Sequence, residues 1–198
     1  MLKTLSDAEI IASSRTAPDR FGAIFDRHFA LIHRYLHRRV GQILADDLAA
    51  ETFAIAFRER GNYHSDREDA RPWLFGIAAN LLRRHRRTER RSLAAYARSG
   101  VDPVAEAGFD AVEDRVVADA AGASIAHALK RLRAEDREVL LLYAWADLTY
   151  HQIADALAIP VGTVRSRLAR ARRSVREHLI ATGHIQAGGA HDQGDLDG

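Results

Sequence analysis

The sequence is poor in several residue types, and each shortage excludes certain folds or kinds of site. Its 198 residues include no cysteine, one methionine and four prolines. The lack of cysteine excludes disulfides and thiolate metal sites, and it is compatible with a reducing compartment. There is no uninterrupted run of about eighteen apolar residues and no signal-peptide stretch at the N-terminus, so we expect a cytoplasmic protein without membrane insertion. Alternating apolar and polar stretches are also scarce, which predicts an all-helical fold.

The net charge of +2 conceals a strong segregation of charge along the chain. The segment 71–91 holds seven arginines and one acid, whereas 102–119 holds six acids and one arginine. A second basic block follows at 165–173, where six of nine residues are arginine or serine and none is acidic. Two basic blocks therefore flank an acidic segment.

The segment 148–173 has the pattern of a helix-turn-helix. Apolar residues recur at helical spacing on both sides of a break at 158–160, namely Leu148, Ile153 and Leu157 before it and Val164, Leu168 and Ala171 after it. Thr149, followed three residues later by Gln152, forms a capping box for the first of the two helices.

The second helix of this motif carries arginines from near its N-terminus onward. A recognition helix enters the major groove of DNA at this end, where the helix dipole also favours phosphate. The alternative is an ordinary solvated helix face. A basic stripe that coincides with a capped two-helix corner favours DNA as the ligand.

The first half of the sequence predicts four helices. Ser6 and Glu9 form another capping box, which opens a short helix through about residue 15. A long helix from residue 19 should end at Gly41 and bury a stripe made of Phe21, Phe25, Phe29, Ile32, Leu36 and Val40. A third helix is expected over 46–60, with acids near its start where they suit the helix dipole.

A polar loop at 62–69 precedes the fourth helix, for which Asp69 is the expected cap. The first part of this helix has an apolar inward side, made of Trp73, Leu74, Ile77, Ala78, Leu81 and Leu82. Its later part, 83–91, is basic all round, so this end should project toward solvent or a polyanion.

These segments predict two small helical domains. We expect the first domain over 1–94, a flexible acidic linker over 95–119, a second domain of four helices over 120–182 and a disordered tail over 183–198. The linker prediction rests on the small, acidic and aperiodic composition of 100–108.

The order of these domains and their motifs resembles the bacterial RNA polymerase sigma factors of the extracytoplasmic-function (ECF) group. The matching stretches in the first domain are DDLAAETFAIAFR (46–58) and RPWLFGIAANLLRRHRR (71–87). In the second domain they are DREVLLLYAWADLTYHQIADAL (136–157) and IPVGTVRSRLARARR (159–173). The resemblance implies a factor that binds core RNA polymerase and promoter DNA, needs no cofactor or metal and is not itself an enzyme.

The resemblance also implies roles for individual residues. The helix around Asp47, Leu48 and Glu51 resembles the surface that binds the clamp helices of the largest polymerase subunit. For the minus-ten promoter element it implies contacts from Asn62, Tyr63, His64, Ser65, Asp66, Asn80, Arg83, Arg84 and Arg87. For the minus-thirty-five element it implies contacts from Thr163, Arg165, Ser166, Arg167, Arg170 and Arg173. An anti-sigma protein is a further partner that members of this group often have.

Four residues depart from the usual pattern of this group. Ala50 stands where glutamine is common beside the acidic residue, and Gly76 stands where a larger, often basic, residue is common. Arg133 stands where proline often precedes a helix, and Ala158 stands where glycine is frequent in the recognition turn. A left-handed conformation at Ala158 would carry a strain of about 1 kcal/mol.

Two other classes of function have some support in the sequence. Helix-turn-helix domains also end many stand-alone transcriptional regulators, but a receiver domain in the first half would show alternating strands and helices, which are missing. A metal enzyme would depend on His28, His33 and His37, which lie close along one predicted helix. No carboxylate follows them at ligand spacing and arginines surround them, so a solvated helix face is the preferred interpretation.

Overall fold

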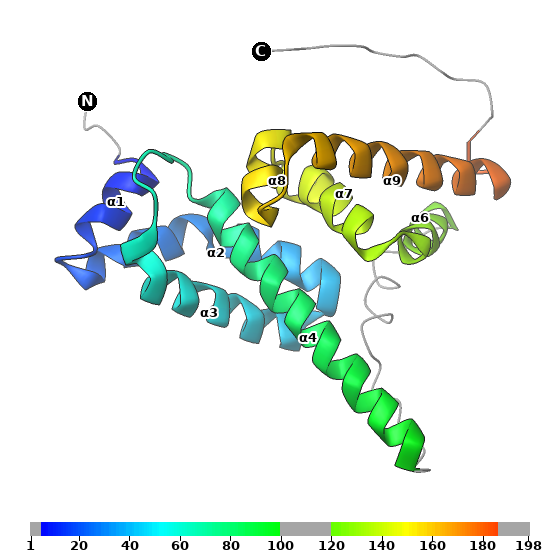
Figure 1. The fold of residues 1–198 in the computed structure, drawn as a ribbon, viewed down its shortest axis with the longest axis horizontal. Coiled ribbons are helices and arrows are strands. Elements are labelled where there is room, and N and C mark those ends of the chain that lie inside the picture. The colour runs from blue at the N-terminus through cyan, green and yellow to red at the C-terminus, as the bar shows by residue number, and fades with distance from the viewer. Residues whose placement is uncertain (1–4, 100–119, 186–198) are drawn as a thin grey trace.

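The computed structural model describes residues 5–99 and 120–185, and every regular element within these two ranges is a helix (Figure 1). The first domain consists of α1 (Asp7–Ser13), η1 (Pro18–Phe21), α2 (Gly22–Val40), α3 (Gln42–Glu59), η2 (Arg60–Asn62) and α4 (Arg71–Ser99), where η marks a 3₁₀ turn. The second consists of α6 (Ala120–Arg131), α7 (Ala134–Ala146), α8 (Tyr150–Leu157) and α9 (Val161–Ala181). The prediction of an all-helical fold is confirmed. Residues 95–99 of the predicted linker continue α4, while 100–119 and the tail from 186 lie outside the described residues.

Helix α2 contributes much of the core of the first domain, although its predicted stripe is buried only in part. Ile32 and Leu36 are fully buried, and Val40 is nearly so. The expectation is wrong for Phe25, which is 40% exposed. Its ring lies at the rim of the core, stacked on Phe29 and edge-on to Phe53. The stripe is therefore buried at Phe21 and again toward the C-terminal end of α2, and the aromatic patch of Phe25 and Phe29 reaches the surface between them.

Gly41 forms the corner between α2 and α3. Its φ of 81° lies in the left-handed region that favours glycine, so one residue joins the two helices. Helix α3 therefore begins at Gln42 and not at residue 46, and the N–H of Ala45 already donates to the carbonyl of Gly41 at 3.0 Å. The acids at 46 and 47 consequently lie beyond the first turn, where the helix dipole contributes little.

Both predicted capping boxes are confirmed. In α8 the N–H of Gln152 donates to Oγ1 of Thr149, while Oε1 of Gln152 accepts from the N–H of Thr149. The same reciprocal pair joins Ser6 and Glu9 at the start of α1. These boxes satisfy backbone donors that a helix start otherwise leaves unpaired, and they fix where both helices begin.

The turn between α8 and α9 depends on Ala158. Its φ of 51° and ψ of 48° place it in the left-handed helical region, as the departure from the family pattern suggested. The N–H of the next residue, Ile159, then donates to the carbonyl of Ala154 at 3.0 Å and closes the end of α8. The corner of the helix-turn-helix is thus built on a strained alanine.

The two domains lie against one another. In Figure 1, α8 lies beside the first turns of α4, and the buried apolar residues of both domains form one continuous cluster. The far end of α4 extends away from both domains (Figure 1). None of the helices in the described ranges is long and apolar enough to cross a membrane.

Replacing Ala158 by glycine should stabilise the protein, because glycine adopts the left-handed conformation without the Cβ strain that alanine carries. We expect the free energy of unfolding to rise by about 0.5–1 kcal/mol, measured by urea denaturation. The matched control is Ala169→Gly in the interior of α9, where the same change should lower stability by about 0.5–1 kcal/mol. A loss of stability in both variants would contradict the strain at position 158.

Candidate nucleic-acid and polymerase interfaces

The recognition helix α9 presents its N-terminal residues to solvent. Arg165 and Ser166 are exposed, and Thr163 and Arg167 are half-buried. The buried side of the helix is formed by Val164, Leu168 and Ala171, as the periodicity predicted. The hydroxyl of Ser166 donates to the carbonyl of Thr163 at 3.1 Å, which orients the first turn. Arginine side chains and a helix N-terminus therefore share one surface, an arrangement suited to an anionic ligand.

Arg170 has a structural partner that the sequence did not reveal. Its guanidinium forms a two-bond contact with the carboxylate of Asp136 on α7, at 3.2 Å and 2.8 Å. Asp136 is buried, so this contact braces α9 against α7. Arg173 lies on the same helix and is exposed. The side chain of Arg170 is thus held by a contact within the domain, whereas a base-reading arginine would be free to contact DNA.

The loop between η2 and α4 exposes most of the residues predicted for the minus-ten element. Asn62, His64, Ser65 and Asp66 are exposed, but Tyr63 is buried. The Tyr63 hydroxyl donates to the carbonyl of Arg67 at 2.6 Å, and its ring packs on Trp73 with the centroids 4.9 Å apart. Tyr63 therefore holds the loop from within, because its hydrogen bond and its ring contact are both internal.

Asp7 fixes the end of this loop from another element. Its carboxylate accepts hydrogen bonds from the backbone N–H of Ala70 at 3.0 Å and from Nε2 of His28 at 2.7 Å, and it pairs with Arg27. The backbone N–H of Asp7 donates to the carbonyl of Glu68. Burial alone would raise the pKa of Asp7, but these hydrogen bonds and the neighbouring positive charges lower it to about 2.

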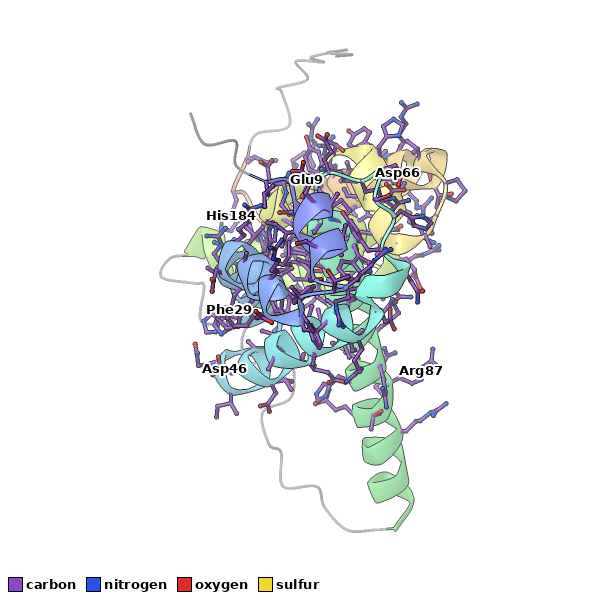
Figure 2. The ribbon with its side chains drawn as sticks, turned by 90° about the vertical axis from the view of Figure 1, so that its left-hand side faces the viewer. Glu9, Phe29, Asp46, Asp66, Arg87 and His184 are labelled. Carbon is purple, nitrogen blue, oxygen red and sulfur yellow. The ribbon has the colours of Figure 1, made fainter. Side chains whose placement is uncertain are left out.

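The basic part of α4 is exposed along one side. Asn80, Arg83, Arg84 and Arg87 are all exposed, and Arg83 donates to the side-chain oxygen of Asn80 at 3.0 Å. A pocket on the same helix is lined by two of these residues, Arg83 and Arg87, and by Arg90 and Arg91. Figure 2 shows Asp66, in the loop, and Arg87 toward the same side of the molecule. The loop and the basic side of α4 therefore form one candidate surface for a nucleic-acid strand.

One arginine of this segment departs from the expectation of a helix basic on all sides. Arg86 is half-buried and faces inward, near Arg39 and Arg137. Burial, together with the positive charges of the two neighbouring guanidiniums, lowers the pKa of Arg86 to about 10. One side of the first basic turns of α4 therefore packs against the rest of the protein.

The surface expected to bind polymerase lies on α3. Asp47 and Glu51 are exposed one turn apart, but Leu48 is only 5% exposed and packs in the core. The sequence did not reveal that Ile43, on the same helix, is 84% exposed. It was overlooked because the helix was expected to begin after it. Figure 2 shows that Asp46, next to this surface, lies opposite Asp66 and Arg87.

The histidines of α2 take part in ordinary polar contacts. Nε2 of His33 lies 2.6 Å from a carboxylate oxygen of Asp46 on α3, and His28 contacts Asp7. Within residues 5–99 and 120–185, no three histidine, cysteine or acidic side chains gather as a candidate metal site.

A helix-turn-helix with an exposed basic recognition helix, joined to a second basic helical domain, defines a class of two-domain DNA-binding protein. Comparison with known families is more specific. Residues 24–92 match the model of sigma-70 region 2, and residues 123–175 match the model of sigma-70 region 4.

Characterised relatives match over most of the chain. The ECF RNA polymerase sigma factor SigL of Mycobacterium tuberculosis is 33% identical over 163 residues, which cover 81% of this chain and 89% of SigL. BldN of Streptomyces coelicolor, an ECF RNA polymerase sigma factor, is 28% identical over 162 residues, which cover 81% of this chain and 61% of BldN. The chain therefore belongs to the sigma-70 family and is a sigma factor of the ECF group. Sigma factors direct core RNA polymerase to promoters and thereby initiate transcription.

Solved structures share the fold. CnrH, in complex with the cytosolic domain of CnrY, matches with a TM-score of 0.64 and 23% identity over 88% of this chain and 97% of CnrH. RpoE of Bartonella quintana, in complex with the anti-sigma factor NepR, matches with a TM-score of 0.60 and 20% identity over 81% of this chain and 97% of RpoE.

Replacing Asp7 by asparagine should destabilise the protein at neutral pH and remove part of its acid sensitivity. The pKa of Asp7 in the folded protein is about 2, below its ordinary value of 3.8, so ionised Asp7 stabilises the fold above about pH 4. That contribution is lost as the pH falls from about 4 to 2. We expect the variant to lose about 2 kcal/mol at pH 7 and the difference from the wild type to shrink over this range, measured by urea unfolding at several pH values.

The control for this prediction is Asp26→Asn, which removes an exposed carboxylate from α2. It should leave the free energy of unfolding nearly unchanged at every pH. A difference between wild type and Asp7→Asn that stays constant down to pH 2 would exclude titration of Asp7 as the cause.

Proposed function

We propose that this sigma factor binds core polymerase through the exposed face of α3. Asp47 and Glu51 supply negative charge, and exposed Ile43 supplies apolar area beside them. A partner surface with basic residues around an apolar site would complement this face. Leu48 supports the face from below, because it is buried.

The loop before α4 and the basic side of that helix would bind the minus-ten element as a single strand. His64, Ser65 and Asp66 are exposed at the loop and would receive an unstacked base. Unstacking one base costs roughly a few kcal/mol. Contacts from Arg83 and Arg87 to the phosphates of the same strand would offset this cost. Tyr63 and Asp7 would keep the loop in place without touching DNA.

The N-terminal part of α9 would read the minus-thirty-five element in the major groove. Arg165, Ser166 and Arg167 lie where a recognition helix meets base edges. A bidentate contact from arginine to guanine contributes about 1–3 kcal/mol of discrimination. Arg173 would contact phosphate, whereas Arg170 would hold α9 in place through Asp136.

Three further proposals follow from this function. The chain would act in the cytoplasm, where polymerase and promoters are found, and it would contribute binding without catalysing a reaction. A protein partner of the anti-sigma kind would regulate it. Support comes from CnrH and RpoE, which were solved in complexes with the cytosolic domain of CnrY and with the anti-sigma factor NepR.

The double variant Arg165→Ala, Arg167→Ala should abolish promoter-specific transcription while leaving polymerase binding intact. Loss of two base contacts of about 1–3 kcal/mol each predicts a decrease on the order of 100-fold or more in reconstituted transcription from a promoter library. Arg176→Ala on the same helix is the control and should have a small effect, since this exposed residue lies far from the N-terminus of α9. Loss of polymerase binding in the double variant would mean that it misfolds and that the base-reading role is unsupported.

Charge reversal on α3, with Asp47→Lys and Glu51→Lys, should weaken binding to core polymerase by at least about tenfold. The reason is that both acids would then face a basic partner surface with the wrong sign. The measurement is a titration of core polymerase, with binding of a minus-thirty-five duplex by the free protein as the folding control. Unchanged polymerase binding would exclude this face, and a wild type that fails to bind polymerase would favour a stand-alone regulator.

A further inference from the structure

Two histidines face one another across the seam between α6 and α9. Nδ1 of His127, on α6, lies 3.4 Å from Nε2 of His178, on α9, and the centroids of the two rings are 5.0 Å apart. His127 is exposed and His178 is half-buried, so the pair lies at the surface of the second domain. Along the axis of α9 the pair is about 20 Å from Arg165. It therefore lies apart from the surfaces that the proposed function uses.

The packing of α6 on α9 fixes the position of both rings. Leu129 of α6 is buried in the hydrophobic cluster, and Val175 of α9 packs against the same cluster. One turn along the seam from the histidines, Oγ of Ser124 lies 2.9 Å from Oγ1 of Thr182. The backbones on both sides of the pair are thus held together by other contacts, and the two rings meet without movement of either helix.

The separation of the two ring nitrogens fits a shared metal ion. Imidazole nitrogens bind zinc at about 2.0–2.1 Å, and two ligands of one tetrahedral ion at that distance lie about 3.3–3.4 Å apart. Either ring nitrogen of a neutral imidazole can be the ligand. The alternative is a hydrogen bond between the rings, but 3.4 Å is longer than the usual range of about 2.7–3.2 Å for a hydrogen bond donated by N–H to oxygen.

The electrostatic surroundings are mixed, so binding would depend on both rings acting together. His178 lies in the last turn of α9, where the negative end of the helix dipole favours a cation. Glu177, the preceding residue, is exposed and adds a negative charge. Lys130 and Arg131 follow His127 on α6 and add positive charges. The charges of these side chains roughly balance, and the two imidazoles provide the specific attraction for a metal ion.

The histidine pair on α2 has a different geometry. The rings of His33 and His37 are nearly parallel, with an interplanar angle of 10° and centroids 6.1 Å apart. Nε2 of His33 already contacts a carboxylate oxygen of Asp46 at 2.6 Å. Stacked rings present their faces to one another, whereas a metal ion needs their nitrogens. His33 and His37 therefore serve as the matched control for the pair between α6 and α9.

We propose that His127 and His178 bind a divalent transition-metal ion that prefers imidazole ligands, and that this ion joins α6 to the end of α9. The two rings supply two ligands, and water supplies the others because the site is open on one side. An ion that binds only the folded arrangement stabilises the second domain by mass action. This site is independent of the polymerase and promoter contacts proposed above.

The experiment titrates Zn²⁺ into the full-length protein, after metal has been removed with a chelator, and measures binding by isothermal titration calorimetry. The wild type should bind zinc. His127→Gln and His178→Gln should each weaken binding at least about tenfold, because a single imidazole loses the gain from chelation. The control is the double variant His33→Gln, His37→Gln, which should keep the wild-type affinity.

Amide hydrogen exchange shows where the ion binds. Zinc should slow exchange severalfold in α6 and in the last turns of α9, both in the wild type and in the control variant. It should have no such effect in His127→Gln or His178→Gln. Both rings lie at the surface, so neither replacement should unfold the domain, and circular dichroism without zinc checks this.

Several outcomes would overturn the site. A wild type that binds no zinc would leave the hydrogen bond as the whole interaction between the two rings. Zinc binding that survives both single replacements, or that is lost in the control variant, would place the ion elsewhere. Binding that leaves exchange in α6 and at the end of α9 unchanged would mean that the ion does not join the two helices. The exchange of the wild type decides this point even if a replacement proves to be unstable.

Discussion

Helix α4 lies in an apolar core at its start and in solvent at its far end, and the rest of the structure is arranged around this requirement. Its first turns are apolar on all sides and need cover from several helices, whereas the turns after Leu82 carry arginines that need water or phosphate. One helix of 29 residues therefore links the core of the first domain to the basic surface proposed to bind a nucleic-acid strand. The helix-turn-helix domain supplies the missing cover through α8, which is why two domains share one apolar cluster.

Local features of the fold could be predicted from the sequence because their causes are local. Two capping boxes, the corner at Gly41 and the left-handed turn at Ala158 each depend on a few neighbouring residues. The start of α3 could not be predicted as well, since only the conformation of Gly41 shows that α2 and α3 need no longer connection. The all-round burial of α4 had a signal in the run LFGIAA (74–79), but one inward face was assigned to it.

The roles of single residues were harder to predict. A family pattern indicates which positions correspond, but it does not say whether a side chain is buried or which residue it contacts. Tyr63 and Leu48 occupy positions expected to bind DNA and polymerase, yet both side chains face inward. Arg170 lies on the recognition helix but pairs with Asp136, which is distant in sequence. Ile43 could not be assigned to a surface until the helix was known to include it. The exposed arginines at 165 and 167 and the acids at 47 and 51 needed only helical periodicity, and the structure leaves them accessible or partly so.

The contacts of Asp7 have a consequence for where the first domain begins. Similarity to sigma-70 region 2 starts at residue 24, whereas Asp7 lies in α1, well before it. This carboxylate nevertheless joins Ala70, at the start of α4, to His28. A fragment that begins at residue 24 would retain every residue proposed to contact the promoter and would lose the contact that fixes the end of the loop before α4. The first domain therefore begins before the segment that matches sigma-70 region 2, because α1 supplies a contact that positions the start of α4.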